Sequence, residues 1–192
     1  MSLADQGQFS GYLRAVVEAL PHPSPSYCLA GALAVNAWGR VRSTQVIDLL
    51  VLSQEPGRAE FIDSLNSRGF LLDMTWMDQN PMTKNRVQRF SHPSYPGIPL
   101  DLMLSADSHK ESALGRRQTL DLLGVHVRVC SPEDLILMKL KASRPHDSED
   151  ALSVIKNPRL QLDLTYLWSR ADRLGLQGEL QYVLQAASGQ GG

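Results

Sequence analysis

The chain has 192 residues, of which 43% are hydrophobic and 20% charged, and its formal net charge is −1. These values are typical of a soluble globular domain with a core of its own. They exclude a strong overall basic field of the kind that attracts nucleic acid. The chain starts without a basic region followed by an apolar segment, and no apolar run approaches the ~20 residues that span a bilayer. We therefore expect a cytoplasmic protein with no membrane partner.

Periodic patterns of apolar residues predict alternating helices and strands over most of the first 130 residues. The strand expected over 46–52 is nearly all apolar, which is typical of a central strand, whereas residues 124–129 alternate as a half-exposed strand does. The pattern predicts helices over 9–20, 33–38 and 58–67, strands over 27–29, 46–52, 70–76, 87–90, 100–104 and 124–129, and a loop over 77–85. The expected fold class is α/β (α+β), a mixed sheet flanked by helices.

The pattern changes to helix after Cys130. Ser131 is followed by a proline and by an acid three residues after the serine, which are signals of a helix N-terminus. This helix should run to about Ser143, a second should begin at Asp147, and further helical patterns cover 162–173 and 179–186.

These patterns divide the chain into three parts. Residues 1–130 are expected to form an α/β core, and residues 131–187 a helical region packed on that core. The glycine-rich residues 188–192 are expected to be a disordered tail.

The two cysteines, Cys28 and Cys130, each lie within an apolar run. Cysteines of this kind in a reducing compartment are usually buried free thiols. We expect two buried, reduced thiols, and a disulfide between them is the alternative that the sequence leaves open.

Three charged residues, Asp48, Asp101 and Lys139, lie inside apolar runs. A buried charge without a partner is expensive, so each of them needs an opposite charge, a metal ion or a cleft. Charged groups that converge on a cleft are typical of active sites. The alternative is that each lies at the end of its element or extends to water.

Asp48 lies on the strand that would carry an Asp-x-Asp pair in a nucleotidyl-transfer site. Residues two apart on a strand point to the same face, so two such carboxylates can hold a pair of Mg²⁺ ions that bridge a triphosphate. Position 46 shares the face of Asp48 but is valine, and Gln45 points to the opposite face. Asp101, on another strand, is the further candidate ligand.

The small-residue turn Ala30-Gly31-Ala32 precedes the helix expected over 33–38. Small residues let backbone N–H groups approach a phosphate at a helix N-terminus, and the alternative is simple packing of strand against helix. Arg40 and Arg42 follow, either as phosphate contacts or as solvated side chains.

Asp147 and Asp150 lie three residues apart on an expected helix, so their side chains are neighbours. One interpretation is a capping arrangement, with Asp147 as N-cap and Asp150 reaching back. The other is that they form ion pairs with Lys139 or Arg144.

Two segments resemble a known family. Residues 29–44 followed by Ile47-Asp48-Leu49-Leu50-Val51 resemble the opening of small bacterial nucleotidyltransferase-fold proteins. Residues 131–136, followed by Lys139, Ala142, Arg144, Asp147 and Asp150, resemble their C-terminal motif. These proteins are related to the nucleotidyltransferase toxins of abortive-infection toxin–antitoxin systems.

The resemblance implies a polymerase-β-like nucleotidyltransferase fold. It implies Mg²⁺ ligation by Asp48 and Asp101, with Lys139 and Asp147 as further catalytic residues. The nucleotide-binding residues that it implies are Gly31, Ala32, Arg42, Thr44 and Lys139. The chain departs from the family at Val46, where the first strand aspartate is expected, and at the Gly-Gly or Gly-Ser turn, which is reduced to Gly31 between alanines.

Three functions remain open from the sequence. The first is transfer of NMP from a nucleoside triphosphate to a protein or RNA hydroxyl. The second, which we rank slightly higher, is an impaired homologue that keeps a nucleotide pocket and acts as a binding or regulatory module, as a homodimer or with an antitoxin partner. The third is a protein-interaction surface formed by the helices after Ser131.

Overall fold

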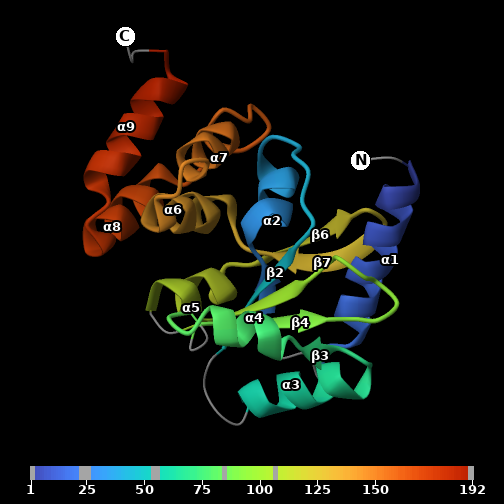
Figure 1. Cartoon of the computed structure of the whole chain (residues 1–192). Helices are drawn as coiled ribbons and strands as arrows, with labels where there is room; N and C mark the ends of the chain where they lie inside the picture. Colours follow the sequence, from blue (N-terminus) through green and yellow to red (C-terminus); the bar gives the residue numbers. More distant parts are fainter. Residues whose placement is uncertain (1–2, 22–26, 53–56, 84–85, 106–107, 190–192) are drawn as a thin grey trace.

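The computed structural model describes residues 3–21, 27–52, 57–83, 86–105 and 108–189. Within these ranges the chain forms one seven-stranded sheet and nine helices (Figure 1). The strands are β1 (Tyr27–Leu29), β2 (Ile47–Leu52), β3 (Leu71–Leu72), β4 (Val87–Ser91), β5 (Leu100–Ser105), β6 (Gln118–Leu122) and β7 (Val125–Val129). The helices are α1 (Leu3–Glu18), α2 (Gly31–Trp38), α3 (Gly57–Ser67), α4 (Met74–Gln79), α5 (Ser108–Gly115), α6 (Pro132–Ala142), α7 (Asp147–Ile155), α8 (Leu164–Leu174) and α9 (Gln177–Ala187).

The sheet has the strand order β3-β4-β5-β2-β1-β7-β6 and is mixed. Strand β2 runs parallel to β5 and antiparallel to β1, and β1 runs parallel to β7. The remaining pairs, β3 with β4, β4 with β5 and β6 with β7, are antiparallel. The expected mixed sheet flanked by helices is confirmed, and the apolar strand β2 lies at its centre as predicted.

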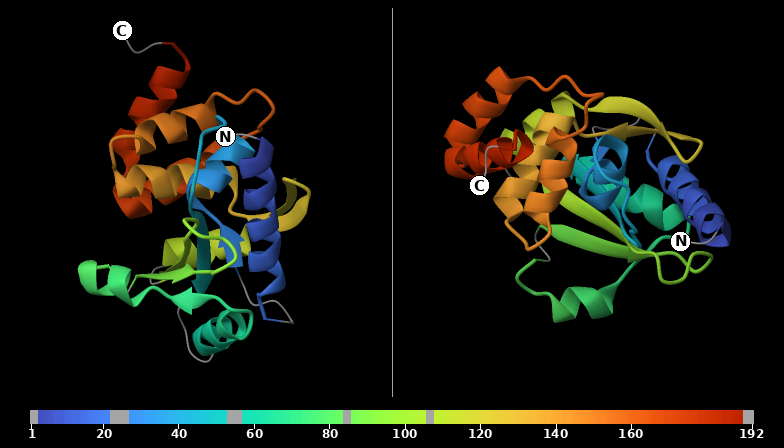
Figure 2. Two further views of the ribbon diagram at one scale, coloured as in Figure 1. Left: turned by 45° about the vertical axis from the view of Figure 1, so that its right-hand side comes forward. Right: turned by 90° about the horizontal axis from the view of Figure 1, so that it is seen from above.

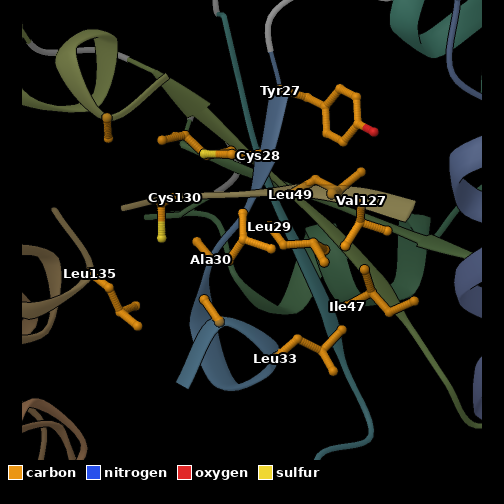
Figure 3. Close-up of a cluster of buried hydrophobic side chains, with 14 of the residues drawn as sticks. Tyr27, Cys28, Leu29, Ala30, Leu33, Ile47, Leu49, Val127, Cys130 and Leu135 are labelled. Carbon is orange, nitrogen blue, oxygen red and sulfur yellow. The ribbon is translucent and has the colours of Figure 1, made fainter. Parts of the chain in front are cut away.

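The core lies on the central strands, where Leu29, Leu49 and Val127 are completely or almost completely buried (Figure 3). Figure 3 also shows Cys28 and Cys130 in this cluster; both are buried free thiols, as expected from their apolar surroundings. The alternation predicted for 124–129 is confirmed, because Val125, Val127 and Val129 are buried while His126 is exposed.

The C-terminal helices α6 to α9 gather at one end of the molecule, with α3 at the other end (Figures 1 and 2). Hydrogen bonds at Trp38, the last residue of α2, join these helices to the segment that follows β7. The Trp38 indole Nε1 donates a hydrogen bond to the Cys130 carbonyl over 2.8 Å, and Asn157 Nδ2 donates to the Trp38 carbonyl over 2.8 Å. A side chain at Gly39 would overlap Ser153 Oγ on α7. This close packing places α6 and α7 beside the segment that leads into β2.

Helix α6 begins as the sequence predicts. Ser131 Oγ accepts a hydrogen bond from the Asp134 backbone N–H over 3.1 Å and donates one to Asp134 Oδ2 over 2.7 Å. Both groups of the capping pair are therefore satisfied inside the protein. The helix ends at Ser143, which has a left-handed backbone with φ of 50°.

The strand predicted over 70–76 is wrong beyond Leu72, and so is the first part of the loop predicted over 77–85. Strand β3 covers only Leu71 and Leu72, and helix α4 follows directly. Asp73 accepts a hydrogen bond from the Trp76 backbone N–H over 2.9 Å. An N-cap carboxylate that satisfies a first-turn donor stabilises a helix, and here it overrides the β-propensity of the neighbouring side chains.

Helix α5 and strand β6 were not predicted from the sequence. Strand β6 lies at the edge of the sheet and its side chains are mainly exposed, so it lacks the apolar pattern of a buried strand. Its turn into β7 has positive φ angles at Leu123 and Gly124, of 55° and 75°. Two consecutive residues of this kind are typical of a tight hairpin turn.

Helix α9 ends at Ala187, within the helical region expected over 131–187. Of the tail that was expected to be disordered, Ser188 and Gly189 are described, and residues 190–192 lie outside the described residues. No helix in the described ranges has both the length and the apolar character needed to cross a bilayer.

Candidate functional site

The structure brings Asp48 and Asp101 together in one cleft. The two residues are direct neighbours across the parallel strands β2 and β5, and each is the second residue of its strand. Both line a cleft of about 1110 Å³ between the sheet, α4 and the helices α6 and α7. The convergence expected from their positions inside apolar runs is therefore present in the fold.

Asp48 is the carboxylate of the cleft that forms no ion pair with any described residue. Burial raises its pKa above the ordinary value, and the neighbouring Asp101 charge adds to the rise, while Lys139, Arg144 and a hydrogen bond from the Ala32 backbone act against it. Like charges side by side in a partly desolvated site favour the protonated form of one of them. Among the described carboxylates of the cleft, Asp48 is thus the one without a compensating ion pair.

Gly31, at the start of α2, lies directly against Asp48. Its φ is +58°, a left-handed conformation that side chains rarely adopt, and a Cβ atom there would overlap Asp48 Oδ2. Glycine is therefore required for two independent reasons, the backbone angle and the close approach. The predicted contact of the small-residue turn with the site is present.

Asp101 is bound on both of its oxygens by Arg89, which the sequence interpretation did not single out. Arg89 Nε donates to Oδ1 and Nη2 donates to Oδ2, each over 2.7 Å. Arg89 on β4 is the direct cross-strand partner of Asp101, and its guanidinium carbon lies 4.4 Å from the centre of the Trp76 ring. The hydrogen bond to Asp101 raises the pKa of Arg89. In the sequence Arg89 resembles any charged residue of a half-exposed strand, and only pairing of β4 with β5 reveals its role.

Lys139 on α6 is buried and bound by two carboxylates. Its Nζ donates to Asp147 Oδ1 over 3.0 Å and to Asp150 Oδ2 over 2.9 Å. Pairing of the two acids with Lys139 was one of the interpretations of the sequence, and it is confirmed. The lysine charge is already more than balanced inside the protein, so its expected role against phosphate remains a prediction.

The N-cap role expected for Asp147 is wrong, because the N-cap of α7 is His146. Asp147 Oδ2 accepts hydrogen bonds from both the backbone N–H and Nε of Arg144, each over 3.0 Å. Burial alone would raise the pKa of Asp147, but the hydrogen bonds from Lys139 and Arg144 together hold it below its ordinary value. A helix turn facing two cations is a better environment for this carboxylate than a cap.

The segment before β2 holds Arg42 at the rim of the cleft. The Asn36 side chain accepts from the Arg42 backbone N–H over 2.9 Å and donates to its carbonyl over 3.0 Å. The predicted nucleotide-binding residue Thr44 does not occur among the described residues that line the cleft. Its hydroxyl accepts from the Val46 backbone N–H over 3.2 Å and donates to the Val46 carbonyl over 3.0 Å. The Thr44 hydroxyl therefore stabilises the backbone just before β2 through hydrogen bonds.

The cleft is lined by more cations than anions. Seven lysine and arginine residues and four aspartates contribute to its described walls. A cleft with excess positive charge raises the local concentration of anions. The cations are Arg42, Arg86, Arg89, Lys110, Lys139, Lys141 and Arg144, and the anions are Asp48, Asp101, Asp147 and Asp150.

These residues do not fit a pair of Mg²⁺ ions. Val46 offers no oxygen, and both oxygens of Asp101 are occupied by Arg89. Within the described ranges, no three His, Cys, Asp or Glu side chains are grouped as metal ligands. A two-metal site needs carboxylates that bridge the ions. The resemblance predicts Mg²⁺ ligation by Asp48 and Asp101, and these two carboxylates alone are too few for the two-ion form of such a site.

Several solved structures are similar to this chain. JHP933 from Helicobacter pylori is 17% identical with a TM-score of 0.50, over 99% of this chain and 96% of that chain. A lincosamide antibiotic adenylyltransferase bound to lincomycin is 16% identical with a TM-score of 0.42, over 67% and 84%. An antigenic nucleotidyltransferase-like protein from Paracoccidioides brasiliensis is 16% identical with a TM-score of 0.43, over 92% of each chain. No family model and no curated protein matches the sequence.

The chain shares the fold of JHP933. The likeness to JHP933 covers nearly the whole of both chains and shows the fold. The mixed sheet, which the sequence pattern predicted, places Asp48 beside Asp101.

Proposed function

We propose that the cleft binds a nucleoside triphosphate, and that this chain is a nucleotidyltransferase homologue in which NMP transfer to a protein or RNA hydroxyl is impaired. The observation that carries the proposal is the pair Asp48 and Asp101, side by side beneath the Gly31 turn in a cleft with excess positive charge. This arrangement combines a helix N-terminus with cationic side chains in one cleft.

The N-terminus of α2 supports phosphate binding. Its N-cap residue, Ala30, makes no capping hydrogen bond through its side chain, and the Asp48 carboxylate lies against Gly31 and accepts from the Ala32 backbone N–H. This end of the helix therefore already holds one anionic group, and helix N-termini favour anions in general. Arg42 and Arg144 lie among the residues that line the same cleft and would add charge to the phosphate contact.

The impairment follows from the chemistry of NMP transfer. An acceptor oxygen attacks the α-phosphorus, the bond to the β-phosphate oxygen breaks, and pyrophosphate leaves with additional negative charge. Metal ions held by bridging carboxylates usually stabilise both the attacking and the leaving oxygen. Val46 and the Arg89–Asp101 pair remove two of the oxygen donors that such ions require.

The test is calorimetric titration of the purified chain with ATP, GTP, CTP and UTP, each with MgCl₂ and separately with EDTA. We expect saturable binding of at least one nucleotide and little incorporation from an α-labelled nucleotide into added RNA or protein. Absence of binding under both conditions would overturn the proposal. Efficient transfer that Asp48→Ala abolishes would show that the catalyst is intact and contradict the impairment.

A second candidate function is binding of a protein partner, an antitoxin or a second copy, through the C-terminal helices. Leu164 and Trp168 lie one turn apart on α8, with 49% and 40% of their surfaces exposed. Exposed large apolar residues on one helix face favour protein contacts. Light scattering after gel filtration measures the oligomeric state, and Trp168→Ser should shift a dimer toward monomer; a monomeric wild type excludes the homodimer.

We also propose a cytoplasmic location for this binding. The support is chemical: Cys28 and Cys130 are adjacent buried thiols without a disulfide, which fits a reducing compartment.

A further inference from the structure

We propose that Arg89 supplies at Asp101 the positive charge that a metal ion would supply, so that the cleft binds its nucleoside triphosphate without Mg²⁺. This inference rests on the proposed nucleotide binding and specifies the chemical form of the ligand. The ligand is the free polyphosphate, held by guanidinium and ammonium groups.

The first step is a row of charges across the sheet. Asp48 pairs in register with Asp101 across β2 and β5, and Asp101 pairs in register with Arg89 across β5 and β4. Directly opposed residues on neighbouring strands have adjacent side chains on one face. The row therefore reads negative, negative, positive along the floor of the cleft, with the arginine on the side of Asp101 away from Asp48.

The second step is the way Arg89 is held. Two parallel charge-assisted hydrogen bonds of 2.7 Å join its guanidinium to Asp101, and Trp76 stacks on the guanidinium at 4.4 Å. Bidentate pairs of this kind are strong and fix the geometry of both groups. A metal ion at Asp101 would have to use the lone pairs that Arg89 leaves free and would lie close to the guanidinium charge, so the pair disfavours metal binding.

The third step is the donor that Arg89 keeps for a ligand. Its Nε and Nη2 serve Asp101, whereas Nη1 donates to no acceptor among the described residues. Arg89 lines the cleft, and 23% of its side-chain surface is exposed. An anionic oxygen in the cleft can accept from Nη1 without disturbing the pair with Asp101.

The fourth step is the charge balance. Asp101, Asp147 and Asp150 are each matched by arginine or lysine in ion pairs, which leaves Asp48 as the unmatched carboxylate among those of the described cleft. Arg42, Arg86 and Arg89 line the same cleft, and their charges attract a free polyphosphate more strongly than one whose charge Mg²⁺ has already reduced. Excess Mg²⁺ should therefore weaken nucleotide binding in this cleft.

The experiment compares ATP binding in EDTA and in MgCl₂ by calorimetry, and measures Mn²⁺ binding to the chain alone by the loss of the free-ion spin-resonance signal. For the wild type we expect ATP to bind at least as tightly in EDTA as in MgCl₂, with no saturable Mn²⁺ site. Arg89→Gln should lose affinity for free ATP by about tenfold, equal to about 1.4 kcal/mol. The double variant Val46→Asp/Arg89→Gln should gain a Mn²⁺ site and bind ATP better with Mg²⁺ than without.

Arg86→Gln is the matched control, because Arg86 is another arginine that lines the cleft but is not the partner of Asp101. It should not create a Mn²⁺ site, even combined with Val46→Asp. Arg89→Lys, which keeps the charge, distinguishes charge loss from a folding defect, and thermal unfolding verifies that each variant is folded.

The outcomes separate this inference from the function on which it rests. Wild-type chain that binds Mn²⁺ saturably, or that binds ATP only with Mg²⁺, overturns the role of Arg89 but leaves nucleotide binding intact. Wild-type chain that binds no nucleotide under either condition overturns the proposed function itself.

Discussion

Gly31 and Asp48 are in direct contact across the start of α2 and the start of β2. The glycine backbone has φ of +58°, and a side chain there would overlap the Asp48 carboxylate. This contact brings the N-terminal turn of α2 onto the row of charges formed by Asp48, Asp101 and Arg89. The shape of this part of the cleft therefore depends on the absence of one Cβ atom.

Gly31→Ala should destabilise the fold by more than the ~1–2 kcal/mol that a left-handed alanine costs by itself, because the methyl group also displaces Asp48. Gly175→Ala is the matched control, since Gly175 has φ of +68° but nothing within 4 Å of the position of its Cβ. Urea unfolding followed by circular dichroism measures both free energies. Equal losses in the two variants would show that the contact with Asp48 adds nothing.

Asp48→Asn should stabilise the protein at neutral pH. Burial and the neighbouring Asp101 raise the folded-state pKa of Asp48, so the folded chain holds this proton more tightly than the unfolded chain. Its contribution to stability is then present below the unfolded pKa and is lost as the pH rises through the folded pKa. We expect a higher melting temperature at pH 7, by ~2–4 °C for each kcal/mol of strain relieved, and a gain that disappears toward pH 3.

The exposed residue Asp63 on α3 supplies the control for that titration. Asp63→Asn should change the melting temperature little at any pH, because an exposed carboxylate has nearly the same environment in both states. A lower melting temperature of Asp48→Asn at pH 7 would mean that the Asp48 charge is stabilising, contrary to the geometry of the cleft.

Lys139→Met should destabilise the protein by about 3 kcal/mol, because it removes the buried cation of this network and leaves its carboxylates with the more exposed Arg40, Arg42 and Arg144. The two carboxylates that it leaves, Asp147 and Asp150, are 3% and 0% exposed. The part of the loss that comes from Asp147 should grow with pH, because Lys139 helps to hold the pKa of Asp147 below its ordinary value in the folded chain. Lys156→Met, at the exposed end of α7, should stay within ~0.5 kcal/mol of wild type. A similar small loss at Lys139 would contradict the buried network.

Arg42→Gln and Thr44→Val test which residues before β2 contact the ligand. Arg42 lines the cleft, so its loss should weaken nucleotide binding about fivefold, or ~1 kcal/mol. The Thr44 hydroxyl is occupied by the Val46 backbone, so Thr44→Val should cost about 0.5–1.5 kcal/mol of stability and leave affinity unchanged. Calorimetric titration with the nucleotide that binds the wild type measures the affinity of both variants. A larger loss of affinity for Thr44→Val than for Arg42→Gln would mean that Thr44 contacts the ligand.

Much of the fold followed from local signals. The apolar run around Asp48, the alternation over 124–129 and the Ser131 cap each act within a few residues, and the structure contains all three elements. The sequence interpretation failed for α4 and β6. Helix α4 depends on the cap formed by Asp73, which is a single residue. Strand β6 lies at the edge of the sheet and lacks the apolar face from which a strand is recognised in a sequence.

By itself, the sequence determined that Asp48, Asp101 and Lys139 must find partners or a cleft, because charge inside an apolar run is costly wherever the chain folds. Only the tertiary structure decided which partners they found. Arg89 reaches Asp101 through the register of β4 with β5, and Lys139 reaches its two aspartates through the packing of α6 on α7. Register and packing are set by contacts between distant segments, and no local pattern in the sequence records them.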